Sequence, residues 1–319
     1  MLKQKYLHEL DFIKGIMIVL VVAFHLVYIG NTYPYAKQVV YTFHMPCFLI
    51  ISGYLMNTDK SPTRFLITLM RFAIPYIIIE SGYIIMASIL PIREHIDNLT
   101  ISIFFDKLLL HPLGPYWYLY TLFICGLTYY CVEHFLNRIN IIIRFILIGS
   151  IFYIYTSTFN IMSISSTMFF LFGALIHKSK FSFTQIFHGL GISFIAFIIL
   201  IQFPQNLNRE SLCGFLIIYS AISMCLFLYK HTRGKLINLI LYLGRNSLLI
   251  FLFSPIFTIL CKFFLPYLLW DKTGMVYLTL SLIFCISGSL FIGLVLDKLK
   301  LSRYIIGKST ALAKSHNPE

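Results

Sequence analysis

The sequence predicts an all-α polytopic membrane protein with about ten transmembrane helices and both termini in the cytoplasm. Of its 319 residues, 59% are apolar and only 12% are charged, and the mean hydropathy is +0.84. A soluble domain cannot cover so much apolar surface, whereas a lipid-facing surface needs no cover. We expect a single membrane domain over residues 1–319, in which residues 297–319 form a short basic cytoplasmic tail.

Windows of about 20 apolar residues, the length that crosses a bilayer, recur along the whole chain. The third window contains Pro75, which favours a kink. Before the fourth window, an amphipathic stretch at 101–110 is typical of a segment that lies on the membrane surface. The predicted spans are 10–29, 39–56, 65–90, 117–135, 141–155, 161–177, 186–203, 212–229, 243–265 and 275–296.

The distribution of Lys and Arg predicts the orientation, because cytoplasmic loops are enriched in both residues. With the N-terminus inside, 19 of the 25 cations fall on the cytoplasmic side. The same partition explains the net charge of +13 as a topology signal, so binding to nucleic acid is not expected. The cations on the outer side are Lys37, Arg93, Lys107, Arg209, Lys262 and Lys272.

The cysteines predict neither a disulfide framework nor a zinc site. All seven fall inside predicted spans, and the sequence contains no Cys-x-x-Cys. We therefore expect no metal ligands. The first apolar run is too long for a signal peptide, and we interpret it as an uncleaved span.

Ionisable residues inside the spans are the strongest functional signal, because charge in hydrocarbon is costly. Lys14 and His25 are eleven residues apart, close to three helical turns, so they share a helix face at a separation of about 16 Å. His44 lies about 8 Å inside the outer end of the second span, a depth similar to that of His25. Glu80 reaches the same level on the third span. The sequence thus predicts a polar chamber at this level, provided that the helices face one another.

Each of these residues also has a structural interpretation. A histidine such as His44 can donate a hydrogen bond between helices. Lys14 can extend its ammonium group to the inner interface, and Ser81 or a backbone carbonyl can satisfy Glu80. The spacing and the shared depth favour the functional interpretation for the set.

Five short signatures follow one another along the chain. They are LDFIKG at 10–15 with His25, FHMPCF at 43–48 with ISGY at 51–54, Arg71 with IPY at 74–76, GPYWYL at 114–119, and LGRNSL at 243–248. In this order the chain resembles the membrane acyltransferase-3 family of bacterial O-acyltransferases, from residue 10 to about residue 255. One departure is Ser254, where many relatives carry a histidine, and it weakens any role for the ninth span.

The resemblance implies an O-acetyltransferase of the bacterial inner membrane, which moves acetyl from cytoplasmic acetyl-CoA to a hydroxyl of a cell-surface or lipid-linked glycan. His25 is then the candidate general base or transient acyl carrier, because imidazole suits both tasks. His44 and Glu80 complete the candidate catalytic set. Cations at the inner side would attract the phosphates of the donor, and the candidates are Lys14, Arg71 and Arg64.

Trp117 and Tyr54 are the candidate acceptor-binding residues, although Trp117 also fits an interfacial aromatic belt. Acetyl-CoA is expected as a substrate and not as a resident cofactor. Besides the donor and a glycan acceptor, the expected partners are membrane lipid and either a second copy or other envelope-assembly proteins.

Two further classes of function stay open. A glycan exporter or flippase would also have about ten spans and a few intramembrane charges, but the sequence lacks the two-halves repeat typical of many transporters. A scaffold in an envelope-assembly complex is the other alternative, and it would need no polar residues at matched depth.

Overall fold

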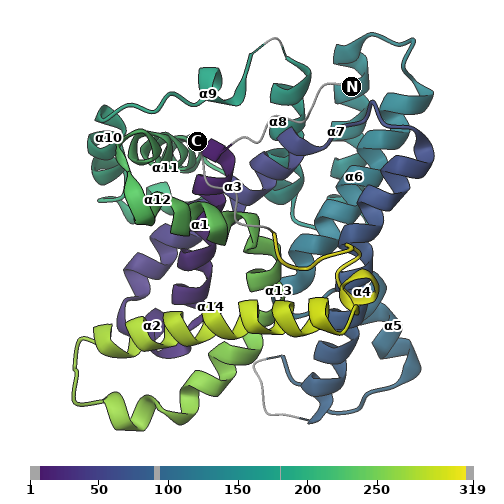
Figure 1. Cartoon of the computed structure of the whole chain (residues 1–319). Coiled ribbons are helices and arrows are strands. Elements are labelled where there is room, and N and C mark those ends of the chain that lie inside the picture. The colour runs from purple at the N-terminus through teal and green to yellow at the C-terminus, as the bar shows by residue number, and fades with distance from the viewer. Residues whose placement is uncertain (1–7, 90–93, 180, 314–319) are drawn as a thin grey trace. The chain divides into compact units, whose positions relative to one another are not determined.

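A computed structural model describes residues 8–89, 94–179 and 181–313 of the chain. Throughout these residues the secondary structure consists of α-helices and 3-10 helices without any strand, which confirms the all-α class (Figure 1). Residues 1–51, 181–299 and 310–319 form one compact unit, which we call the first unit. Residues 52–180 and 300–309 form the second unit. The expectation of one domain stays a prediction, and each unit is described by itself.

In the first unit, α1 (His8–His25) contacts the short helix that follows it and four further helices (Figure 1). Its apolar residues are buried from Leu10 to Ala23 with few interruptions, as expected of a helix surrounded by protein. The four further helices are α11 (Leu212–His231), α12 (Gly234–Arg245), α13 (Ser247–Leu260) and α14 (Met275–Lys298).

The packing of α1 on α12 depends on two glycines. A Cβ placed on Gly15 would lie 2.2 Å from the carbonyl oxygen of Ile240, and one placed on Gly244 would lie 1.7 Å from that of Asp11. No side chain fits at such distances, so the two backbones touch directly. Close approach of this kind, through small residues, is typical of helix pairs in membranes.

The other long helix of the first unit, α3 (Pro34–Leu55), packs on α10 and on the segment that follows it. The Thr42 hydroxyl donates a hydrogen bond to the Leu207 carbonyl over 2.9 Å, and the rings of Phe43 and Phe197 meet edge to face at 5.7 Å. The remaining elements are α2 (Val27–Thr32), α9 (Phe183–Ile186), α10 (Ile192–Leu200) and the 3-10 turns η2 (Pro204–Leu207), η3 (Cys261–Phe263) and η4 (Leu265–Leu268).

In the second unit, α6 contacts α4, α7 and α8. Gly53, in the last turns of α3, lies against the Phe170 carbonyl of α8, where a Cβ would be 2.0 Å away. The hydroxyls of Ser52 and Tyr118 share a 2.8 Å hydrogen bond. The elements are α4 (Pro62–Ile89), α5 (Ile101–Leu109), η1 (Gly114–Tyr116), α6 (Trp117–Phe135), α7 (Ile141–Ser157), α8 (Ile164–Lys178) and α15 (Ser302–Ile305).

Every predicted span contains helix, but three of them are interrupted. The span at 10–29 breaks at Leu26, between α1 and α2. The span at 186–203 consists of the end of α9, a non-helical stretch and the short α10. The span at 243–265 contains the junction at Asn246, where the chain bends by 81° between Gly234–Arg245 and Ser247–Phe263.

In the described residues, four helices are long and apolar enough to cross a membrane, or five if the bent pair counts as one span. Ten spans and cytoplasmic termini therefore stay predictions. The predicted end of the third span at Leu90 lies outside the described residues, as do Lys3, Lys5, Arg93, Lys180 and Lys314 of the charge partition.

Candidate functional site

The first unit brings the two predicted histidines together around a tyrosine. The ring of Tyr41 lies between them, with its centroid 6.0 Å from that of His25 and 5.0 Å from that of His44. His25 is exposed at the end of α1, whereas His44 is 3% exposed within α3. The structure thus brings both predicted histidines close to Tyr41, while their shared depth in the membrane stays a prediction.

Both histidines are held in the same tautomer by the helix that carries them. The Nδ1 atom of His25 lies 2.7 Å from the carbonyl oxygen of Val21, and that of His44 lies 2.7 Å from the carbonyl oxygen of Val40. A carbonyl oxygen only accepts, so Nδ1 must carry the hydrogen in each ring. A neutral imidazole then has its lone pair on Nε2, which is the arrangement needed to accept a proton.

Tyr41 also provides a hydrogen-bond donor for the end of α1. Because the helix stops at His25, the last carbonyl groups of α1 have no partner within the helix. The hydroxyl of Tyr41 donates a hydrogen bond to one of them, the carbonyl of Phe24, over 3.3 Å. Tyr41 therefore fixes the position of α1 beside α3 at the level of the histidines.

Two cations lie at this end of the unit. The ammonium group of Lys37 sits 5.5 Å from the centroid of the Tyr41 ring, at a distance that permits a cation–π interaction. Arg209 follows η2 closely, and its charge acts on His44, as that of Lys37 acts on His25. Both side chains are half-buried.

At the other end of α1, the predicted donor-binding lysine belongs to a charge cluster. Lys14 Nζ lies 2.8 Å from Asp11 Oδ1, and Arg245 Nε lies 3.4 Å from Asp11 Oδ2. Arg245 also contacts His8 Nδ1 at 3.1 Å through Nη2. Among the described residues, one carboxylate thus contacts both cations.

Glu80 belongs to the second unit, where it holds the start of α6. Its Oε1 atom accepts a 2.6 Å hydrogen bond from the backbone N–H of Leu113, and Glu94 accepts one of the same length from the next N–H, that of Gly114. Gly114 has φ +58°, a conformation that favours glycine. Glu80 is fully buried, and its Oε2 has no hydrogen-bond partner among the described residues.

The other predicted residues of the second unit lie in separate surroundings. Arg64 and Arg71 are exposed on α4. Burial and the nearby charge of Arg71 lower the pKa of Lys60, which precedes that helix. The Tyr54 ring meets the His177 ring edge to face at 5.8 Å. Trp117 begins α6, with its ring 6.4 Å from that of Tyr118.

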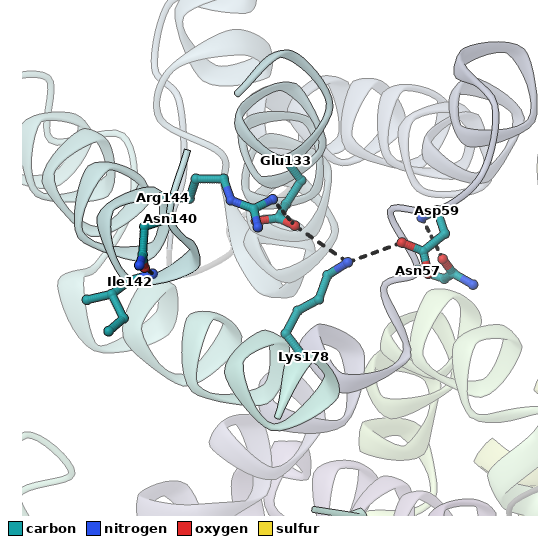
Figure 2. Close-up of polar contacts among 7 residues, drawn as sticks. All are labelled: Asn57, Asp59, Glu133, Asn140, Ile142, Arg144 and Lys178. Atoms are coloured by element: carbon teal, nitrogen blue, oxygen red, sulfur yellow. Dashed lines mark hydrogen bonds and ion pairs between the residues drawn. The ribbon is translucent and has the colours of Figure 1, made fainter. Parts of the chain in front are cut away.

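A second charge cluster joins three helices of this unit. Figure 2 shows Lys178 between Asp59 and Glu133, at N–O distances of 3.2 and 3.5 Å. Arg144 lies 2.9 Å from the same Glu133 oxygen that contacts Lys178. Glu133 is buried, so the cluster ties the ends of α6, α7 and α8 together.

Sequence reasoning missed three residues of the site in the first unit. The first is Tyr41, which precedes His44 by three residues and follows Lys37 by four. Helical periodicity alone places Lys37, Tyr41 and His44 on one helix face. Asp11 and Arg245 stand inside the quoted signatures but received no role. Their contact joins residues 234 positions apart, and no local pattern predicts it.

Comparison with known proteins decides the family. The acyltransferase-3 family model, described as an acyltransferase domain, matches residues 7–294. The chain belongs to the acyltransferase-3 family. Membership confirms the resemblance seen in the signatures and makes the chain an integral membrane protein of the acyltransferase type.

Relatives of this acyltransferase-3 protein include two from Staphylococcus aureus, strains MSSA476 and N315. Both are named "Probable poly-beta-1,6-N-acetyl-D-glucosamine export protein". Each is 24% identical over 310 residues, and the alignment covers 86% of this chain and 85% of the relative. No solved structure matches this acyltransferase-3 chain significantly.

Proposed function

We propose that this acyltransferase moves an acetyl group from cytoplasmic acetyl-CoA to a hydroxyl of a cell-surface or lipid-linked glycan, at the bacterial inner membrane. The observation that carries the proposal is the tautomer of His25. Its Nδ1–H is committed to the Val21 carbonyl, so the Nε2 lone pair is available in an exposed position. A base in this state can take the proton from an acceptor hydroxyl as the oxygen attacks the thioester.

The charge cluster at the start of α1 supports the proposal that the donor enters from that end of the helix. The phosphates of CoA need cations, and Lys14 and Arg245 supply two beside one carboxylate. Lys14 stands eleven residues before His25 on the same helix, about 16 Å along its axis. The extended pantetheine arm of CoA would bridge this distance and carry the thioester to His25.

His25 has two roles consistent with this chemistry. As a base, it removes the hydroxyl proton and returns it to the departing CoA thiolate. As an acyl carrier, its Nε2 attacks the thioester carbonyl and releases the CoA thiolate; the hydroxyl oxygen then displaces the neutral imidazole from the acyl group, and the hydroxyl proton passes to the thiolate. The roles predicted for His44, Glu80, Arg71, Arg64, Tyr54 and Trp117 rest on the sequence and the family resemblance, and they stay predictions.

The test is transfer of radiolabelled acetyl from acetyl-CoA to glycan by membranes that hold equal amounts of wild type and variants. We expect His25→Gln to lower the rate by about 10²- to 10⁴-fold, the usual contribution of a general base. His231→Gln is the matched control, because His231 also directs Nδ1 to the carbonyl four residues earlier, at 2.8 Å from Phe227. It should keep the wild-type rate. If radiolabel stays on the wild-type protein after the reaction is quenched, and is absent from His25→Gln, His25 acts as the acyl carrier.

The names of the relatives favour a second candidate, an exporter of glycan. An exporter would move glycan into or out of sealed vesicles without any acetyl appearing on it. Wild type that moves glycan but transfers no acetyl, or His25→Gln with full transfer activity, would contradict the acyltransferase mechanism and favour export.

A further inference from the structure

The outer end of the first unit holds two cations that no carboxylate neutralises. Within the described residues, neither Lys37 nor Arg209 takes part in an ion pair, although both are half-buried. At the other end of α1, in contrast, Lys14 and Arg245 share Asp11. A guanidinium group has five N–H donors, and a half-buried one without a protein partner must turn them to water or to a ligand.

Lys37 is held beside the Tyr41 ring, and the loop that carries Arg209 is held against α3. Lys37 extends over the Tyr41 ring and packs on Gly30, where a Cβ would come within 3.0 Å of the Lys37 Cδ. Arg209 comes two residues after Leu207, whose carbonyl accepts the hydrogen bond from Thr42. Thr42 follows Tyr41 directly, so this bond places the start of the Arg209 loop against the same stretch of α3.

The chemistry of the two groups indicates what they bind. The planar guanidinium group of arginine matches a phosphate or a carboxylate with two parallel hydrogen bonds, and a lysine ammonium adds a point charge. The two cations also oppose the positive charge that a histidine gains when it takes a proton. An anion bound between them would relieve this opposition at the moment of transfer.

We propose that Lys37 and Arg209 form an anion subsite that selects acceptors carrying a phosphate or carboxylate close to the hydroxyl to be acylated. The proposal rests on the function proposed above, which places the reaction at His25. The donor does not supply this anion, because its phosphates are assigned to Lys14 and Arg245, about three helical turns away along α1. The anion therefore belongs to the acceptor.

The experiment compares three acceptors in nanodiscs of zwitterionic phosphatidylcholine. They are one neutral oligosaccharide, the same oligosaccharide with a phosphate monoester, and the same with a uronic acid carboxylate. For wild type, we expect kcat/KM to be at least about tenfold higher for one of the anionic acceptors, since a hydrogen bond to a charged group contributes about 1.5–3 kcal/mol. The favoured anion identifies the acceptor chemistry.

The variant Lys37→Gln/Arg209→Gln should use all three acceptors with similar kcat/KM, and Lys37→Arg/Arg209→Lys, which keeps both charges, should restore the preference. Lys272→Gln, which removes an exposed cation predicted on the same side, should match wild type. Equal kcat/KM of the wild type for all three acceptors, or a preference that survives in the double Gln variant, would overturn the subsite.

Binding without the donor separates this proposal from the function on which it rests. If wild type transfers acetyl to no acceptor, the proposed function fails, and the subsite is judged by equilibrium binding of the three oligosaccharides. Tighter binding of an anionic one, lost in the double Gln variant, supports the subsite even then. Equal binding of all three, together with loss of bound phosphatidylglycerol from the double Gln variant, would assign the cations to a lipid headgroup and overturn it.

Discussion

The two ends of α1 carry the same kinds of charge in opposite circumstances. At the start of the helix, Lys14 and Arg245 share the carboxylate of Asp11, next to backbones that touch at Gly244. Towards its end, Lys37 lies over the Tyr41 ring, and neither Lys37 nor Arg209 forms an ion pair within the described residues. A cation that is paired with a carboxylate has a fixed position and contributes to stability, even where it also serves to attract the donor. We therefore expect changes at the first end to affect folding as well as donor binding, and changes at the second to affect turnover with little effect on folding.

The largest expected effect is that of Gly244→Ala. The new Cβ would lie 1.7 Å from the Asp11 carbonyl oxygen, and only separation of α1 from α12 relieves this clash. We expect a loss of about 3 kcal/mol or more of folding free energy, at the upper end for overpacking. The measurement is the midpoint of thermal unfolding in detergent. Gly82→Ala is the control, because nothing lies within 4 Å of its Cβ.

We expect Asp11→Asn to cause the second-largest loss of folding free energy. The Arg245 side chain is only 6% exposed, and the substitution removes the carboxylate that it contacts. Removing one member of a largely buried ion pair costs about 3 kcal/mol, which a lowered unfolding midpoint would report. The double variant Asp11→Asn/Arg245→Gln should recover part of the loss. An unchanged midpoint for the single variant would mean that the two ends do not differ as described.

Tyr41→Phe is expected to have a smaller effect. It removes the 3.3 Å hydrogen bond to the Phe24 carbonyl but keeps the ring between the histidines. The free energy of unfolding should fall by about 1 kcal/mol, the net value of one hydrogen bond. Tyr41→Leu, which also removes the ring, should lower both stability and acetyl transfer further. Equal behaviour of the two variants would show that the ring has no part in the site.

The smallest effect on stability is expected for Lys37→Gln and Arg209→Gln. Lys37 loses only a cation–π contact, worth about 0.5–1 kcal/mol, and Arg209 loses no ion pair. Their unfolding midpoints should stay close to that of wild type while Asp11→Asn falls. A drop as large as that of Asp11→Asn would show that both ends of α1 are structural, and would remove the contrast.

Much of the fold was predictable where one helix coincides with one apolar window. The helix α6 begins and ends at the predicted residues 117 and 135, and α14 begins at Met275 as predicted. The bend at Asn246 was missed because α12 is amphipathic, with Lys235 and Arg245 among its residues, and an apolar window does not detect such a helix. The break at Leu26 lies within the first apolar window, and the hydropathy of that window gives no sign of it.

The candidate site was predictable only where depth or spacing determines it. Counting residues from the ends of two spans placed His25 and His44 at one level, and the structure joins them through Tyr41. The pairing of Asp11 with Arg245 depends on how α1 and α12 pack, which one sequence does not specify. Glu80 illustrates the opposite case. Its depth was countable, but its hydrogen bond to Leu113 depends on the path of a loop.

The position of His25 as the last residue of α1 has an electrostatic consequence. The peptide dipoles of a helix sum to a partial negative charge at its C-terminus, and a cation there is stabilised by about 0.3–1 kcal/mol, or up to about 2 kcal/mol when partly buried. His44 lies in the middle of α3 and receives no such field. An imidazole that becomes imidazolium during the reaction is therefore favoured at His25, where α1 ends, and the break at Leu26 sets which of the two histidines is better suited to hold the proton.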